Sequence, residues 1–272
     1  MKGRLVLRFL VGILSAVALS LGAQPQTAIY EQYIHQASQY QKEGRYAQAE
    51  AAYTAALEDI ERKLGPEHVA AAQVLVNIGT VRALQHDDSG AKKAFDRSLS
   101  ITERAFGAEH LQVGLTLLTI AMLTHKQGHY ATAEPLYRRA LPILEKNLGP
   151  MHERIALLKA SMAKLYLVQG RNSDAEALLE EAIPVLENAG EPAEATLMVA
   201  LAALADAYLR DGRYARAEPL YNRVLAKARE KPQAMNDEIQ LGLRAYARML
   251  RKMKRKTEAR EIEEQLKTMF PR

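Results

Sequence analysis

The sequence contains no cysteine and no tryptophan, and only 4 of its 272 residues are phenylalanine. The absence of cysteine excludes disulfides, thiolate catalysis, iron–sulfur clusters and zinc sites with sulfur ligands. Any bound metal would need histidine and carboxylate ligands. Glycine (15) and proline (10) are too scarce for a collagenous or low-complexity chain. The remaining composition, 48% hydrophobic and 25% charged, is that of an ordinary folded protein.

A long apolar run lies near the N-terminus, where Lys2, Arg4 and Arg8 lead into 13 residues from Phe9 to Leu21. This order of a basic and then an apolar region predicts a secretory signal peptide over residues 1–23. Thirteen residues are too few for a transmembrane helix, which needs about 20.

Cleavage of the predicted signal is expected after Ala23, with Ala18 as the other candidate, because small residues precede both positions. The alternative is an uncleaved anchor that begins at Leu5. The chain has no cysteine for lipid attachment or disulfides. We therefore expect a periplasmic or secreted bacterial protein or, if the anchor is retained, an inner-membrane protein facing the periplasm.

Small residues recur in the rest of the chain with a period of 42. One column is alanine in every copy: Ala49, Ala91, Ala133, Ala175, Ala217 and Ala259. Twelve residues earlier the column is again small: Ala37, Gly79, Ala121, Ala163, Ala205 and Ala247. Four residues after the first column stand mostly large residues: Tyr53, Phe95, Tyr137, Leu179, Tyr221 and, as an exception, Glu263. The period indicates a repeat protein.

Each repeat is predicted to form two helices, which we call helix A and helix B. Small residues allow their backbones to approach, and the large residue fills the space beside them. A glycine column marks the turn between the two helices, with His86 and Lys254 as exceptions: Gly44, Gly128, Gly170 and Gly212. Helix B should end at linkers that contain glycine and histidine: 64–68, 106–110 and 148–152.

These columns resemble the tetratricopeptide repeat, whose usual period is 34. The 42-residue period, the linkers and the runs 133–137 and 217–221 resemble the kinesin-light-chain variant. The resemblance covers residues 30–270 and implies an all-α solenoid of about six repeats and twelve helices in a right-handed superhelix. Departures are the absent tryptophan, Pro142 and Pro184 inside predicted helices B, and a fifth linker, residues 230–236, without glycine.

No catalytic motif accompanies the repeats: the chain has no phosphate-binding loop, nucleophile elbow or zinc-binding H-E-x-x-H. We expect no enzyme activity, metal or cofactor. His125 and His129 have helical metal-ligand spacing, but Gly128 should separate them. The histidines at 68, 110 and 152 lie in different repeats and are predicted to be linker residues before helix A.

The resemblance implies that the protein is an adaptor whose concave groove binds a protein or peptide. The groove residues expected from the family's helix A positions are Val76, Leu115, Leu118, Met122, Leu157, Lys164, Leu209, Arg244 and Arg248. The alternative is that these side chains pack on the next repeat, with the register shifted by one residue. An accessory subunit of an envelope complex and an enzyme with an unrecognised groove site are the competing functions.

The formal net charge of +5 is concentrated at the two ends of the chain. Residues 1–23 contribute +3 and residues 244–272 contribute +6, which leaves the middle mildly acidic. Nucleic acid is therefore not an expected partner. A basic run in the last repeat is expected to keep that end soluble, or to contact anionic lipids or an acidic partner: Arg251, Lys252, Lys254, Arg255 and Lys256.

Overall fold

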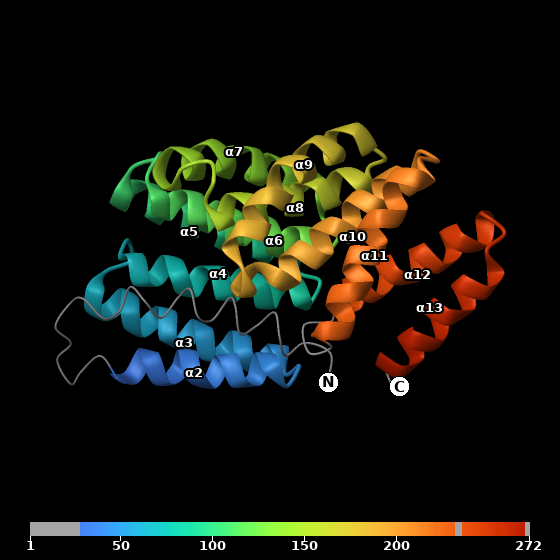
Figure 1. The fold of residues 1–272 in the computed structure, drawn as a ribbon. Coiled ribbons are helices and arrows are strands. Elements are labelled where there is room, and N and C mark those ends of the chain that lie inside the picture. Colours follow the sequence, from blue (N-terminus) through green and yellow to red (C-terminus); the bar gives the residue numbers. More distant parts are fainter. Residues whose placement is uncertain (1–27, 232–235, 270–272) are drawn as a thin grey trace. The chain divides into compact units, whose positions relative to one another are not determined.

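The computed structural model describes residues 28–231 and 236–269, and these residues form twelve α-helices and no β-strand (Figure 1). Helices A are α2 (Ala28–Lys42), α4 (Val69–Leu84), α6 (Leu111–Lys126), α8 (Glu153–Val168), α10 (Glu194–Arg210) and α12 (Asp237–Lys252). Helices B are α3 (Tyr46–Leu64), α5 (Asp88–Phe106), α7 (Tyr130–Leu148), α9 (Asn172–Ala189), α11 (Tyr214–Glu230) and α13 (Lys256–Met269). The predicted all-α fold of six helical pairs is confirmed. The predicted signal peptide lies outside the described residues.

The chain divides into two compact units, unit 1 (Met1–Ile143) and unit 2 (Leu144–Arg272). The boundary falls inside α7, so it does not coincide with the end of a repeat. Pro142 and Pro184 lie inside α7 and α9, and both helices continue past them as single elements. Both prolines are exposed, as expected where a missing backbone donor can be tolerated.

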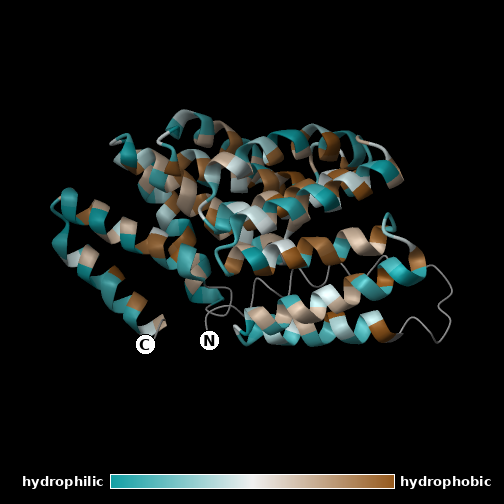
Figure 2. Cartoon of the chain, turned by 180° about the vertical axis from the view of Figure 1, so that it is seen from behind, coloured by the Kyte–Doolittle hydropathy of each residue, from teal (hydrophilic) through white to brown (hydrophobic). Residues whose placement is uncertain are grey.

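The alanine columns hold the helices of each pair together. Ala37, Ala49, Ala121 and Ala133 are all fully buried. At Gly79 an added Cβ would lie 2.5 Å from the ring of Phe95, so the second repeat has room only for glycine there. Hydrophobic residues accordingly form stripes along the helices (Figure 2).

The turns between helix A and helix B share a left-handed residue. The glycines of the turn column have φ between 73° and 84°. His86 and Lys254, the two exceptions in sequence, have φ of 64° and so adopt the same conformation without glycine. The turn geometry is therefore imposed by the helices it joins, because a side chain at positive φ carries a steric cost.

The linkers before helices A contain a second feature, which their sequence did not predict. His68, His110 and His152 are N-caps: each Nδ1 accepts a hydrogen bond from the backbone N–H two residues later, at 3.1 to 3.2 Å. In the same register Asn236 caps α12 through the backbone N–H of Ile239 at 2.9 Å. The predicted linker position is confirmed, and capping is the physical reason for the histidine.

Candidate binding surface on the helices A

The accessible side of each helix A is the candidate binding surface, which we call the helix-A face. Gly79 contacts Phe95 and therefore faces helix B. At 100° per residue, Asn77 lies about 200° from Gly79 and points away from helix B. Asn77 and its equivalents Thr119, Ser161 and Ala203 are all partly exposed. These polar and small residues form the middle row of the face in repeat register.

Three further rows complete the helix-A face in the 42-residue register. The first is apolar from the third repeat onward: Gln73, Leu115, Leu157, Val199 and Leu241. The next has mixed chemistry and is accessible from the third repeat onward: Met122, Lys164, Asp206 and Arg248. Its member in the second repeat, Thr80, is buried. The last is also mixed: Leu84, Lys126, Val168, Arg210 and Lys252. Unit 2 thus presents an apolar row beside rows that are small or charged, whereas in unit 1 the same row holds Gln73 and Leu115.

Five of the nine predicted groove residues lie on this face: Leu115, Met122, Leu157, Lys164 and Arg248. The structure places two others in the core, since Val76 is 8% and Leu118 is 6% exposed. Val76 packs with Phe95 and with Ile120 of the next helix A. At this position the alternative prediction, a register shifted by one residue, is confirmed, because the accessible residue is Asn77.

The position of Val76 is where one helix A packs on the next. In unit 2 its equivalent Ala202 lies so close to α12 that a Cβ added to Gly242 would be 2.7 Å from the Ala202 Cβ. In the last repeat the same position holds Arg244, which is exposed. Arg244 therefore belongs to a polar end surface, as expected of a terminal repeat.

Leu209 occupies a position that elsewhere interacts with the helix B residue twelve places later. Gln41 accepts a hydrogen bond from the Tyr53 hydroxyl at 3.2 Å, and His125 Nδ1 lies 3.3 Å from the Tyr137 hydroxyl. In the last repeat the corresponding pair is charged, with Arg251 2.7 Å from Glu263. That ion pair explains why Glu263 departs from the aromatic column.

In the fifth repeat this pairing is incomplete. Here the pair consists of Leu209 and Tyr221, and the buried Tyr221 hydroxyl has no hydrogen-bond partner in the structure. The Tyr221 ring is stacked on Tyr246 at 5.1 Å, and burial raises the pKa of the Tyr221 phenol far above its ordinary value. Leu209, which was predicted to line the groove, has no polar group that could form a hydrogen bond with the Tyr221 hydroxyl.

The charges on the helix-A face of unit 2 are only partly balanced. Lys164 of α8 donates to Glu238 of α12 at 2.7 Å, and Arg210 donates to Asp206 at 2.9 Å. Arg248 and Lys252 are exposed and have no ion-pair partner among the described residues. The face therefore retains positive charge near α12.

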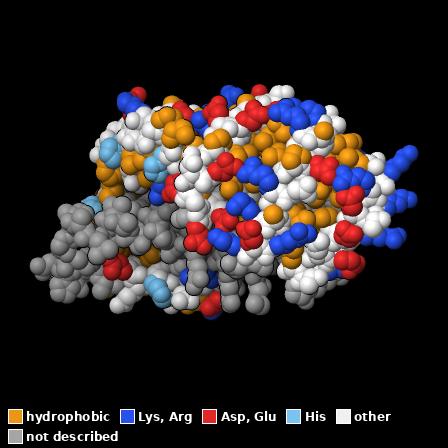
Figure 3. Space-filling model, viewed as in Figure 1, with side chains coloured by type: hydrophobic (Ala, Val, Ile, Leu, Met, Phe, Trp, Pro, Cys, Tyr) orange, Lys and Arg blue, Asp and Glu red, His pale blue; other side chains and the backbone are white. Residues whose placement is uncertain are grey.

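The basic run of the last repeat is partly neutralised. Arg251 pairs with Glu263, and Arg255 binds Glu218 at 2.7 Å and Glu258 at 2.5 Å. Three exposed lysines remain unpaired within the described part of the chain: Lys252, Lys254 and Lys256. Lysine and arginine side chains gather over α12 and α13 at the right of Figure 3.

The two histidines with metal-ligand spacing, His125 and His129, have different partners. His125 bonds Tyr137, whereas His129 lies 3.1 Å from Asp88. Among residues 28–231 and 236–269, no three histidine or carboxylate side chains cluster as metal ligands would. In the same ranges, no helix has the length and hydropathy of a membrane span.

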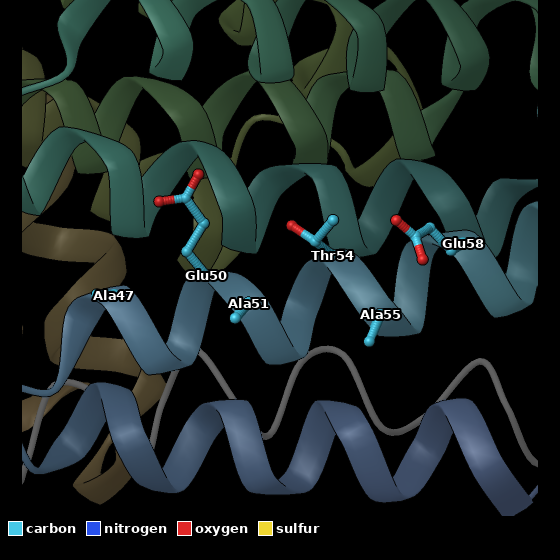
Figure 4. A pocket seen from close by; sticks show the side chains of 6 residues that line it. All are labelled: Ala47, Glu50, Ala51, Thr54, Ala55 and Glu58. Atoms are coloured by element: carbon cyan, nitrogen blue, oxygen red, sulfur yellow. The ribbon is translucent and has the colours of Figure 1, made fainter.

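A hollow of about 450 Å³ along α3 is lined by that helix alone (Figure 4). Its lining consists mainly of small residues, and Glu50 points from it toward α4. There the Glu50 carboxylate accepts hydrogen bonds from Arg82 and Gln85 at 2.7 and 2.9 Å. The hollow is thus an open helix surface whose main polar group is already engaged.

The fold defines a helical repeat protein whose helices A have one accessible face. Two tetratricopeptide repeat models match the chain, one over residues 30–95, 90–146 and 153–230, the other over 202–272. The chain belongs to the tetratricopeptide repeat family. No protein of curated function has a matching sequence.

Solved structures with this fold include kinesin-light-chain-type proteins. BtubC (BKLC) from P. vanneervenii has a TM-score of 0.64 and 22% identity, covering 73% of this chain and 79% of that chain. Kinesin light chain repeats from Podosopora anserina have a TM-score of 0.61 and 18% identity, covering 74% and 96%. A Rap protein complexed with Competence and Sporulation Factor has a TM-score of 0.57 and 15% identity, covering 88% and 74%.

Proposed function

We propose that the protein is an exported, non-catalytic scaffold that binds a protein or peptide partner on its helix-A face. The observation that carries the proposal is the accessible apolar row, which includes Leu157, Val199 and Leu241 in unit 2. This row runs beside the small residues Ser161 and Ala203. Small side chains let a ligand backbone approach, and the apolar row offers surface for its side chains.

The fold supports this proposal. Solenoid proteins bind partners on the surface that their repeats present in series. The structurally similar Rap protein was solved as a complex with a factor, which shows that this architecture can hold a ligand. Met122, on the helix-A face of unit 1, adds a flexible side chain that adapts to different partners.

Charge substitutions in two rows of the helix-A face test the binding surface. Met122→Glu and Leu157→Glu should each abolish capture of partners from a cell-envelope extract, because they place a carboxylate on apolar surface. Ala177→Glu, on the exposed side of helix B α9, is the matched control and should leave capture unchanged. Circular dichroism should show the same helicity and melting for all three. Unchanged capture by both groove variants would contradict the proposal.

Export rests on the sequence pattern of residues 1–23. Fractionation and intact mass of the protein should give a periplasmic chain that lacks these residues. The alternative is an accessory or regulatory subunit that an uncleaved N-terminus anchors in the inner membrane. A membrane fraction containing the full-length chain would favour that alternative, and a full-length cytoplasmic chain would contradict both.

A second candidate interaction is contact with an anionic membrane surface. It is favoured by the unpaired lysines of the basic run: Lys252, Lys254 and Lys256. Clustered cations of this kind bind anionic lipids in a salt-dependent manner. Co-sedimentation with phosphatidylglycerol vesicles should fall when the three lysines are replaced by glutamine. Equal co-sedimentation with phosphatidylcholine vesicles would exclude an electrostatic contact.

A further inference from the structure

Successive helices B are joined by ion pairs between residues 36 places apart. Arg97 of α5 lies 2.6 Å from Glu61 of α3, and Arg139 of α7 lies 2.5 Å from Glu103 of α5. In unit 2, Arg223 of α11 pairs in the same way with Glu187 of α9. An arginine on the later helix and a glutamate on the earlier one is therefore the usual arrangement.

The junction between α7 and α9 departs from this arrangement. The register places Glu181 where the arginine stands elsewhere, opposite Glu145. The missing cation comes instead from helix A: Lys159 Nζ lies 2.7 Å from Glu181 Oε2 and 3.1 Å from Glu145 Oε1. The charges are thus rearranged rather than lost.

Lys159 occupies a core position. Its equivalents in the second, third, fifth and sixth repeats are buried leucines: Leu75, Leu117, Leu201 and Leu243. Lys159 is itself only 9% exposed. Burial alone lowers the pKa of Lys159, but hydrogen bonds with Glu181 and Glu145 outweigh that effect and raise the pKa above its ordinary value. The ammonium group is therefore held charged inside the repeat.

The buried charges around Lys159 are not the most stabilising arrangement for this junction. A buried ion pair contributes less to stability than packed apolar residues, because both charges lose their hydration. The neighbouring repeats achieve the same junction with a buried leucine and a partly exposed Arg–Glu pair. The exchange at Lys159 therefore needs a reason other than stability.

A cavity of about 340 Å³ opens beside Lys159. Apolar walls are provided by Pro150, Met151, Pro184 and Val185, and the charged groups are Lys159, Glu180 and Glu181. Met151 is 66% exposed, although its equivalents in the two preceding linkers, Glu67 and Glu109, are glutamates. Lys159 lies about 200° around α8 from Leu157 and Ser161, so the cavity is on the side opposite the helix-A face.

We propose that this cavity is a second binding site, which takes a guanidinium or ammonium group on an apolar stem, such as an arginine side chain of a partner protein. Two carboxylates line the cavity, Glu180 and Glu181, and a third, Glu145, binds Lys159 from outside the lining. Lys159 and Arg216, which pairs with Glu180, balance two of these three negative charges. The excess negative charge favours a cation. The exposed Met151 supplies contact for the methylene stem, since such stems bury well against apolar surface.

Hydrogen-bond acceptors at the cavity match such a ligand. Glu181 uses Oε2 for Lys159 and is otherwise exposed, so Oε1 is available to a donor. Pro184 has no N–H, which leaves the backbone carbonyl of Glu180, four residues earlier, without its helical donor. A guanidinium carries five N–H donors and no acceptor, and so fits a site rich in acceptors.

Binding is tested with Nα-acetyl-arginine amide as the probe and the uncharged Nα-acetyl-citrulline amide as its matched control. The reporter is the Met151 methyl resonance in full-length methyl-labelled protein, assigned with Met151→Leu. The arginine probe should produce a saturable shift, and citrulline should bind at least about tenfold more weakly because it lacks the charge. Equal shifts from both probes, or no saturable shift from arginine, would overturn the proposal.

The double variant Lys159→Leu/Glu181→Arg restores the arrangement of the α3–α5, α5–α7 and α9–α11 junctions. It should keep its helicity, and its affinity for the arginine probe should fall at least about tenfold. Glu181→Gln leaves Lys159 paired with Glu145 and should lower the affinity for the arginine probe several-fold. This single variant tests the site even if the double variant fails to fold. Glu264→Gln on α13 is the control and should change nothing. Unaltered affinity in Glu181→Gln would mean that the charge exchange is structural only.

Discussion

Two junctions with the same register distribute their charges differently. In unit 1, Leu117 is fully buried, and an ion pair between Arg139 and Glu103 joins α7 to α5. At the equivalent positions of unit 2, Lys159 is buried between Glu145 and Glu181. The repeat backbone tolerates either arrangement, because in both cases each carboxylate keeps a cation within hydrogen-bonding distance. The difference shows that repeats can exchange apolar packing for internal charge when several positions change together.

Leu117→Lys breaks this comparison most severely. It buries an ammonium group in a junction that has one carboxylate, already paired with Arg139. We expect a loss of about 3–5 kcal/mol in the free energy of unfolding. Urea denaturation followed by circular dichroism measures it.

The rescue variant for that experiment is Leu117→Lys/Arg139→Glu. It transplants the charge arrangement of Lys159 and Glu181 into unit 1 and should recover most of the lost stability. A double variant no more stable than Leu117→Lys would show that the arrangement depends on more than these three positions.

The reverse exchange, Lys159→Leu/Glu181→Arg, should stabilise the protein by about 1–3 kcal/mol. It replaces a buried ion pair with a leucine and moves the cation to a position of greater exposure. The melting temperature should rise accordingly. The single variant Lys159→Leu separates the effect of the core leucine from the effect of the new arginine, since it leaves Glu145 and Glu181 facing each other without Lys159. A destabilised double variant would contradict the leucine-based interpretation of this junction.

The aromatic column offers a second contrast of satisfied and unsatisfied groups. Tyr137→Phe removes a hydroxyl that His125 partners and should cost about 1 kcal/mol. Tyr221→Phe removes a buried hydroxyl without a partner and should be neutral or stabilising. Chemical denaturation of both variants gives the difference. Equal destabilisation by the two changes would show that the Tyr221 hydroxyl is satisfied in solution.

The smallest expected effect concerns the turn column. His86→Gly and Lys254→Gly should each stabilise the protein by up to about 1 kcal/mol, since both residues have φ of 64°. Gly128→Ala is the opposite change in an equivalent turn and should destabilise by a similar amount. Thermal melts of the three variants, compared with the unmodified protein, measure these changes in stability. A loss of stability in His86→Gly would mean that its side chain contributes more than its backbone strain costs.

Prediction from sequence succeeded for the helices and failed for part of the surface. The 42-residue columns identified both helices of every repeat, because small residues at fixed spacing report close packing. The register of the helix-A face was partly wrong, since helices A are buried around most of their circumference and their periodicity is weak. A usable signal was present: the buried row contains Val76 and Leu118, and the accessible row next to it contains Asn77 and Thr119.

Two other features were visible in the columns but had no interpretation without contacts. Histidine recurs before three helices A, yet capping became evident only from the hydrogen bonds of His68, His110 and His152. Lys159 stands in a column of leucines, a departure that could have been noticed from the period alone. Its meaning required Glu145 and Glu181, which lie on two other helices.

Residue spacing along the chain was enough to predict the family, the number of repeats, the turns and three of the linkers. These properties depend on residues within one repeat, where spacing along the chain translates directly into position on a helix. Three properties could be seen only in the tertiary structure. They are the accessible side of each helix A, the pairing of Glu145 with Lys159, and the lack of a hydrogen-bond partner for the Tyr221 hydroxyl. Those properties depend on side chains from different helices meeting in space, and burial makes each such meeting, or its absence, energetically important.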